Sequence, residues 1–430
     1  MEQLIENKLI KADEAFSEWK KIPFEHRQKL IAKAAEILKT RSEEFGAIIT
    51  SEMNKPISQA IAEVEKCALM MNYYADAENI LQPEKIESEY TYSEIHYIPK
   101  GVILGVMPWN FPFWQVLRFA TPAILAGNTV VLKHASICFG SGNAIEKVLL
   151  EAGFPEGVFQ NLEIGHKDVR EVLEHTAISG VSLTGSEKAG AEVASIAGQN
   201  IKKSLLELGG SDAFIVLDDA DLDEAAKVGA LARLQNCGQT CVAAKRFIID
   251  EKIEDVFLPK FIEEYKKYIP ADPMDKETKI AGMARPDLAD DLEKQFRRAL
   301  ENGAEIILPL ERISDNEFKP GLIRVKEGNP ILQEELFGPL GMVMTAGNDE
   351  EALQLANDIP FGLSNSVWTK DKARQLFFIE NLESGTVNIN RMTSSDPRFP
   401  FGGTKSSGYG TELSLLALKE FVTAKTVVGN

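Results

Sequence analysis

The stretch NCGQTC, residues 236–241, contains a cysteine that could perform covalent chemistry. Cys241 ends this stretch, and Gly238 and Gln239 predict a tight polar turn before it. A cysteine attacks as the thiolate, which a polar turn or a nearby positive charge favours. Most free cysteines are buried and inert, so the turn alone leaves both interpretations open.

A carboxylate and an amide could assist such a thiolate. Glu207 lies in LLELGG, where the flanking leucines make a buried charge costly. A partly buried glutamate with a raised pKa suits a general base, and a solvated carboxylate at a strand end is an equal alternative. Asn110 follows the apolar run GVILGVMP and could donate to a developing oxyanion or merely form an Asx-turn.

Two further segments could bind a phosphate. The stretch TGSEKAG, residues 184–190, follows a strand-like run and opens a helix-like one. Its small residues would let the backbone approach a phosphate at the helix N-terminus, although the spacing is not GxGxxG. Lys133 ends the run TVVLK and would face the ligand crevice of a parallel sheet, or it could be a solvated charge.

The elements around these segments alternate between strands and helices. Apolar runs predict buried strands, and helical spacing of apolar residues predicts helices between them. This alternation indicates an α/β fold with a parallel sheet. The expected strands are 101–108, 129–133, 177–184 and 213–217, and the expected helices are 113–125, 142–151, 167–175 and 187–197.

A helical region precedes this block, and a second α/β block follows it. Helices are expected at 12–19, 27–39 and 57–74. The second block has expected strands at 245–249, 303–308 and 340–344, with helices at 256–268, 288–302 and 350–357. The alternating segments 90–98 and 423–428 predict an exposed arm and a strand able to pair with it.

Composition excludes several classes of function. The 430 residues are too many for one core and predict two or three domains. A net charge of −18 gives no broad surface for nucleic acid or an anionic membrane. Four cysteines form no disulfide framework and no zinc-ligand pattern, so we expect a cytoplasmic protein without a metal. The charged N-terminus and the lack of a long apolar run predict neither a secretion signal nor a membrane span.

Taken in order, the motifs resemble the aldehyde dehydrogenase superfamily over nearly the whole chain. The matching stretches include GVMPWNFPFWQVLRFATPAILAGNTVVLKHAS, VSLTGS, LLELGGSDAFIVLDDADLD, NCGQTCVAAKRFII, EELFGP, ANDIPFGLSNSVWT and PFGGTKSSGYG. Three of them, LKHAS, GQTCVAAKRFII and SSDPRFPFGGTKSSGYG, are most similar to the short succinate-semialdehyde dehydrogenases.

This resemblance implies catalytic roles. Cys241 matches the nucleophile, which forms a hemithioacetal with the aldehyde; a hydride then passes to the nicotinamide and leaves a thioester. Asn110 and the Cys241 backbone N–H match the oxyanion hole. Glu207 matches the base that activates water to release the acid, and its presence disfavours a variant that acylates coenzyme A.

The resemblance also implies how a dinucleotide binds. Lys133 matches the residue on the adenosine ribose. Ser136 stands where NAD-preferring relatives often have a glutamate that repels a 2′-phosphate, so we expect NADP to be preferred and NAD to be accepted. The other matching positions are Trp109, the turn Thr184, Gly185 and Ser186 near the pyrophosphate, and Glu335 and Phe337 at the nicotinamide ribose.

A carboxylate-bearing substrate needs a cation, and Arg118 matches an arginine that clamps succinate semialdehyde. Ser394 and Ser395 match serines that complete the carboxylate pocket. Some relatives have a second arginine where this chain has Gln235, and Arg233 is expected on another helical face. The resemblance implies succinate semialdehyde as the substrate, and the missing second arginine leaves the identity of the acid open. The alternatives are glutarate semialdehyde, glycolaldehyde, an aliphatic aldehyde, or a catalytically silent homologue that only binds the cofactor.

The same resemblance implies three domains. Residues 1–80 and 100–208 would form a Rossmann-type cofactor domain, and 209–408 an α/β catalytic domain. Residues 81–99 and 409–430 would form an arm that cannot bury itself alone, which predicts a homodimer or homotetramer. Cys237 could form a disulfide with Cys241, or be a small buried residue. Thr411, in place of a common arginine, is expected to be a minor change.

Overall fold

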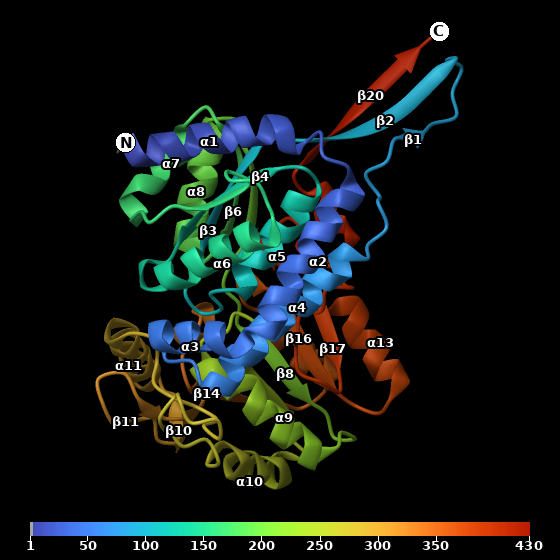
Figure 1. The fold of residues 1–430 in the computed structure, drawn as a ribbon. Helices are drawn as coiled ribbons and strands as arrows, with labels where there is room; N and C mark the ends of the chain where they lie inside the picture. The colour runs from blue at the N-terminus through green and yellow to red at the C-terminus, as the bar shows by residue number, and fades with distance from the viewer. Residues whose placement is uncertain (1–2) are drawn as a thin grey trace.

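Residues 3–430 of the computed structural model form two large sheets, the helices that cover them and a projecting β-arm (Figure 1). The first sheet has the order β19-β7-β6-β3-β4-β5, and all of its neighbours run parallel except β19 and β7. The expected strands at 101–108, 129–133 and 177–184 are β3, β4 and β6. The bounds are β3 Val102–Met107, β4 Thr129–His134, β5 Phe159–Asn161, β6 Ile178–Thr184, β7 Lys203–Glu207 and β19 Gly408–Tyr409.

Successive side chains of this sheet enter two different cores, because strand residues alternate between faces. Ile103 and Val130 point into a core with helices α2 to α6. Leu104 and Val131 point into a core with α1, α7 and α8. The helices are α1 Gln3–Trp19, α2 Phe24–Thr40, α3 Ser42–Met53, α4 Ile57–Ala75, α5 Trp114–Leu125, α6 Phe139–Ala152, α7 Val169–Glu174 and α8 Glu187–Gln199.

The second sheet has the order β10-β13-β14-β9-β8-β16-β17 and is parallel except for β10. Its strands are β8 Asp212–Val216, β9 Ala244–Asp250, β10 Glu305–Leu308, β13 Gly321–Arg324, β14 Leu340–Ala346, β16 Ser364–Trp368 and β17 Thr386–Ile389. Its helices are α9 Leu222–Leu234, α10 Glu254–Tyr265, α11 Pro286–Glu301, α12 Asp349–Asn357 and α13 Lys372–Asn381. The expected α/β fold with parallel strands is confirmed.

The β-arm leaves the body of the molecule, with the C-terminus near its tip (Figure 1). β2 (Tyr92–Pro99) pairs antiparallel along its whole length with β20 (Val422–Gly429), and β1 (Glu84–Lys85) pairs with β2. The expected pairing strand at 423–428 is therefore confirmed. Just before β20, Leu413, Leu418 and Phe421 pack into the first core. Among the helices of residues 3–430, none is both long enough and apolar enough to cross a membrane.

Candidate active site

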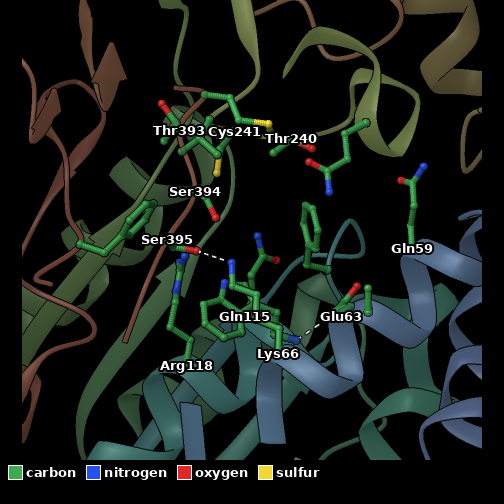
Figure 2. A pocket seen from close by; sticks show the side chains of 17 residues that line it. Gln59, Glu63, Lys66, Gln115, Arg118, Thr240, Cys241, Thr393, Ser394 and Ser395 are labelled. Atoms are coloured by element: carbon green, nitrogen blue, oxygen red, sulfur yellow. Dashed lines mark hydrogen bonds between the residues drawn. The ribbon is translucent and has the colours of Figure 1, made fainter. Parts of the chain in front are cut away.

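The carboxyl ends of β3, β6 and β7 bring several of the proposed site residues to one edge of the first sheet. Cys241 approaches that edge from the second sheet, in the segment before β9. It lines two cavities. One, of about 200 Å³, lies against helices α4 and α5 and is called the α4–α5 cavity (Figure 2). The other, of about 240 Å³, lies at the turn before α8 and is called the α8 cavity.

The thiol of Cys241 is half-buried, and burial raises its pKa to about 11. The charges of Arg118 and Lys245 oppose this rise by favouring the thiolate. Lys245 is fully buried and donates from Nζ to the carbonyls of Thr240 and Cys241, at 2.8 and 2.5 Å, and to Glu335 Oε1 at 2.9 Å. The Lys245 ammonium group thus connects the backbone of Cys241 to Glu335, which lines the α8 cavity.

Asn110 lies beside Cys241 in the α8 cavity and is buried. Its side-chain Nδ2 donates to the backbone carbonyl of Gln239 at 3.0 Å. Its backbone carbonyl accepts from Lys55 Nζ at 2.8 Å and from Asn236 Nδ2 at 2.9 Å. Lys55 also forms a buried ion pair with Glu63. The amide is therefore held against the turn that carries the thiol.

That turn has an unusual backbone. Asn236 and Cys237 have φ of 54° and 55°, in the left-handed region, and Gly238 follows with φ of 71°. Non-glycine residues occupy this region at a cost, which the bonds of Asn236 offset. The Cys237 side chain packs into the core of the second sheet, whereas Cys241 packs against the first core. Both thiols are free, and the turn directs them into different parts of the molecule.

Glu207 ends β7 and is almost completely buried, and neither of its carboxyl oxygens has a hydrogen-bond partner among residues 3–430. Burial raises its pKa well above the usual range, the neighbouring Glu412 raises it further, and Arg118 opposes the rise. Glu207 lines neither of the two cavities. The structure thus places this carboxyl behind the site, beside Glu412, and does not bring it to Cys241.

The α4–α5 cavity is lined by Cys241 and by several polar side chains. Arg118 on α5 forms a buried ion pair with Glu412 and stacks over the Phe401 ring at 4.6 Å. Lys66 on α4 donates to Ser395 Oγ at 2.8 Å. The polar lining residues are Gln59, Glu63, Lys66, Gln115, Arg118, Gln235, Thr240, Thr393, Ser394 and Ser395.

Arg233 does not reach this cavity. Its buried guanidinium donates to the carbonyls of Leu336 and Leu340, both at 2.9 Å, and of Gly238 at 3.2 Å. Gln235 lines the α4–α5 cavity instead. Arg233 therefore fixes the EELFGP loop to the NCGQTC turn and contributes no charge to the α4–α5 cavity.

The α8 cavity has features that suit a dinucleotide. Among residues 3–430, Thr184 Oγ1 in the lining and Glu187 Oε1, which faces Gly209, have no hydrogen-bond partner. A methyl group added at Gly209 would collide with the carboxylate oxygens of Glu187 and Glu335, so glycine makes room for these two carboxylates. Ser186 precedes α8, whose first-turn N–H groups can bind an anion. The cavity lining includes Trp109, Thr184, Gly185, Ser186, Glu335 and Phe337, and the Trp109 and Phe337 rings meet edge to face at 5.7 Å.

Lys133 and Ser136 lie at and just beyond the carboxyl end of β4, outside both cavities. Burial lowers the pKa of Lys133, and Ser136 is exposed. Their edge of the sheet is continuous with that of β3 and β6, so a long ligand in the α8 cavity can extend toward them. Within residues 3–430, no group of three His, Cys, Asp or Glu side chains is arranged to hold a metal ion.

Comparison with known proteins identifies the fold. The family model named aldehyde dehydrogenase family matches residues 2–427. The chain belongs to the aldehyde dehydrogenase family. This confirms the resemblance of the motifs, and the enzyme is an NAD(P)-dependent oxidoreductase that acts on aldehydes.

Similar proteins include two curated bacterial enzymes. A probable succinate-semialdehyde dehydrogenase (NADP(+)) of Synechocystis sp. is 47% identical over 424 residues, which cover 98% of this chain and 93% of the relative. A succinate semialdehyde dehydrogenase (NAD(P)+) of Escherichia coli is 42% identical, covering 98% and 92%. The crystal structure of succinic semialdehyde dehydrogenase from Streptococcus pyogenes with NADP+ is 38% identical with a TM-score of 0.97, covering 100% of this chain and 96% of that chain.

Several charged residues of the site escaped the sequence analysis, among them Lys245, Glu412 and Lys66. Glu412 follows Thr411 in TELSLLAL, where it reads as a solvated charge, yet it is buried against Arg118. From the sequence, Lys66 would be expected to be a solvent-exposed lysine on a helix. Its spacing from Gln59 and Glu63 was an available signal, because residues 59, 63 and 66 share one helical face.

Proposed function

We propose that this aldehyde dehydrogenase oxidises succinate semialdehyde to succinate and prefers NADP to NAD. The observation that carries the proposal is the α4–α5 cavity, which joins Cys241 to a pair of cationic side chains and two serines. A carboxylate at one end of a short aldehyde would meet charge-assisted hydrogen bonds there. The names of the Synechocystis, Escherichia coli and Streptococcus pyogenes relatives support the same substrate.

Cys241 would act as the nucleophile. Its thiolate adds to the aldehyde carbon, forming a C–S bond and placing negative charge on the oxygen. Asn110 Nδ2 and the Cys241 N–H would donate to that oxygen. The Asn110 amide has two N–H donors, so one can stay on the Gln239 carbonyl while the other donates to the oxygen. Bound NADP would supply the hydride acceptor. Release of the acid then requires water, and Glu207 would accept the proton of that water after moving out of its place beside Glu412.

The α8 cavity would hold the nicotinamide end of NADP. Among residues 3–430, the Thr184 hydroxyl has no partner there, and Gly209 makes room for the carboxylates of Glu187 and Glu335. Glu335, Phe337 and Trp109 would flank the nicotinamide ribose, and the turn Thr184–Ser186 the pyrophosphate. Lys133 and Ser136 would receive the adenosine ribose and its 2′-phosphate, because Ser136 is small, neutral and exposed.

The test compares succinate semialdehyde with butanal, which has the same carbon chain without the carboxylate, using NADP and NAD in turn. Because charge-assisted contacts act on the carboxylate alone, kcat/KM should be about tenfold to a hundredfold higher for the semialdehyde. It should also be higher with NADP. Cys241→Ala should abolish reduction of either cofactor. Equal or better use of butanal contradicts the substrate, and equal or better use of NAD contradicts the cofactor preference.

We also propose the three-domain division, with residues 1–80 and 100–208 binding the cofactor and 209–408 carrying the nucleophile. The β-arm exposes the apolar side chains of Tyr92, Ile98 and Val428, which supports a homodimer or homotetramer built through it. Light scattering should give a monomer mass when the arm is shortened. Free cysteines support a cytoplasmic location, which cell fractionation can test.

A further inference from the structure

Helix α4 presents a polar stripe to the cavity beside Cys241. Gln59, Glu63 and Lys66 follow one another at helical spacing and all line the α4–α5 cavity. In Figure 2, Lys66 and Arg118 reach from their helices toward Ser395, and Cys241 lies across the cavity from them. Two positive charges thus stand opposite the thiol.

The two charges are not equally available. The charge of Arg118 is balanced by Glu412, with which it forms a fully buried ion pair through Nε, although its Nη2 has no hydrogen-bond partner among residues 3–430. Within the described residues 3–430, Lys66 forms no ion pair; its Nζ donates to Ser395 Oγ at 2.8 Å and lies 4.2 Å from the centre of the Trp114 ring. Glu63, the carboxylate of the stripe, is paired with Lys55. The cavity therefore holds one ammonium group that is fixed in place but not neutralised.

We propose that Lys66, held by Ser395 and Trp114, is the principal cation that binds the carboxylate of the substrate. This inference rests on the proposed function, since it assigns the recognition of a carboxylate-bearing aldehyde to a named side chain. An ammonium group has three donors. One of them meets Ser395, so two are left for a carboxylate. Arg118 would then act mainly by holding Glu412 and by favouring the Cys241 thiolate.

The surroundings of Lys66 are consistent with such a role. Burial and the charge of Arg118 on α5 together lower its pKa to about 8, and Cys67, Glu63 and Asp396 oppose the change. A bound carboxylate would stabilise the charged form. The affinity for the semialdehyde should therefore weaken as the pH rises through about 8, whereas the affinity for butanal should not.

The test uses Lys66→Met and Lys66→Arg, with Lys227→Met as a matched control on the exposed face of α9. Lys66→Met should raise KM for succinate semialdehyde about tenfold to a hundredfold and leave kcat/KM for butanal within about twofold. Lys66→Arg should keep most of the affinity, and Lys227→Met should change neither substrate. An unchanged KM, or an equal loss with both aldehydes, overturns the proposal.

The same measurements separate this proposal from the one on which it rests. If the wild-type enzyme prefers the semialdehyde and Lys66→Met still binds it normally, only the role of Lys66 fails. If the wild-type enzyme does not prefer it, the proposed substrate fails as well. Should Lys66→Met not fold, the pH dependence of KM of the wild-type enzyme decides: a rise above about pH 8 for the semialdehyde alone supports Lys66, and equal profiles contradict it.

Discussion

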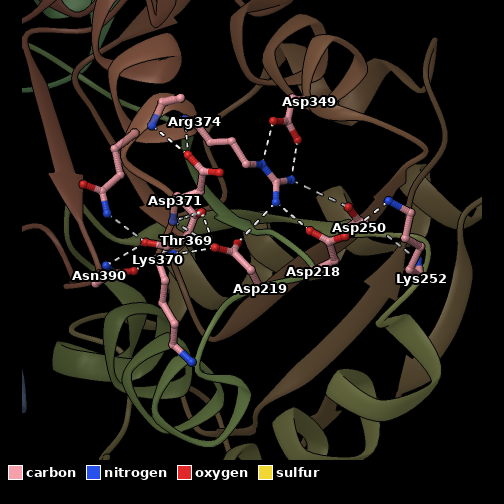
Figure 3. Close-up of polar contacts among 12 residues, drawn as sticks. Asp218, Asp219, Asp250, Lys252, Asp349, Thr369, Lys370, Asp371, Arg374 and Asn390 are labelled. Carbon is pink, nitrogen blue, oxygen red and sulfur yellow. Dashed lines mark hydrogen bonds and ion pairs between the residues drawn. The ribbon is translucent and has the colours of Figure 1, made fainter.

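Arg374 and Arg118 each stand at the centre of an ion cluster, one in the second sheet and one behind the α4–α5 cavity. The Arg374 cluster consists of Arg374 and four aspartates, Asp218, Asp219, Asp250 and Asp349 (Figure 3). Its carboxylates come from the ends of β8 and β9 and the start of α12, and its arginine from α13. The Arg118 cluster consists of Arg118, Glu412, Glu207 and Lys66.

The two clusters distribute charge in opposite ways. In the Arg374 cluster, the hydrogen bond to Arg374 lowers the pKa of Asp218, and every aspartate is reached by solvent or by the arginine. In the Arg118 cluster, burial raises the pKa of Glu412 and of Glu207, and within residues 3–430 Lys66 forms no ion pair with a carboxylate. The first arrangement joins segments of the fold. The Arg118 cluster holds buried carboxyl and ammonium groups with shifted pKa values, and such groups are frequent at functional sites.

Removal of the arginine should cost most in the buried cluster. Arg118→Met leaves Glu412 and Glu207 buried together without the arginine that pairs with Glu412, so the free energy of unfolding should fall by about 3 kcal/mol or more. Urea unfolding measures the change. The double variant Arg118→Met/Glu412→Gln should recover part of the loss, because no charge then remains buried in the pair. A single variant within about 1 kcal/mol of wild type would contradict this account of the cluster.

The reactivity of the Cys241 thiol should depend on the Arg118 cluster and not on the Arg374 cluster. Because the pKa of Cys241 is about 11, its thiolate fraction, and so its rate of alkylation by iodoacetamide, should rise about tenfold per pH unit from pH 7 to 9. Arg118→Met should slow alkylation about tenfold, since Arg118 favours the thiolate. Arg374→Met is the control and should leave the rate unchanged. Equal rates in the two variants would remove the proposed link between Arg118 and Cys241.

Arg374→Met should cost less stability than Arg118→Met. Its ion pairs are partly solvated, and such pairs contribute about 0–1 kcal/mol each, so a total loss of about 1 kcal/mol is expected in urea unfolding. Added salt should reduce the difference, because screening acts on exposed charges. A loss of stability as large as that of Arg118→Met would contradict the contrast between a partly solvated and a buried cluster.

The smallest expected effect is the pH dependence of the stability difference between the wild-type enzyme and Arg374→Met. The folded pKa of Asp218 lies below its ordinary value of 3.8, so its contribution is present above that pH and is lost as the pH falls through the folded pKa. The stability gap between wild type and Arg374→Met should therefore be constant from about pH 7 to 5 and narrow only below about pH 4. A gap that closes before pH 5 would contradict the lowered pKa.

The sequence predicted the long apolar strands and the alternating arm strand β2 but not the polar strands β16 and β17. The runs that became β3, β4, β6 and β14 are continuous and buried on both faces, which makes them recognisable. The strands β16 and β17 contain buried Ser364 and Asn388, whose side chains bond to each other at 3.1 Å and both to Thr393. Polar residues that satisfy one another inside a sheet remove the apolar pattern on which the prediction depends.

The site was predictable where motifs are local and not where pairing is distant. Cys241, Asn110 and Thr184 lie in recognisable stretches, and the structure brings all three to the α8 cavity. Lys66 meets Ser395, and Arg118 meets Glu412, across hundreds of positions in the sequence. A charged residue on a helix or loop is normally solvated, so burial of these charges follows only from the packing of α4 and α5 against the C-terminal segment.

Trapping the acyl enzyme tests the central claim, that Cys241 is the nucleophile and Glu207 the base. Glu207→Gln, in a Cys237→Ala background, would be incubated with succinate semialdehyde and NADP, and the peptide that contains Cys241 analysed by mass spectrometry. Because hydrolysis is slowed while thioester formation is not, we predict a peptide heavier by one succinyl group, together with about one reduced cofactor per active site. A Cys241 that stays unmodified while cofactor is reduced would contradict the account.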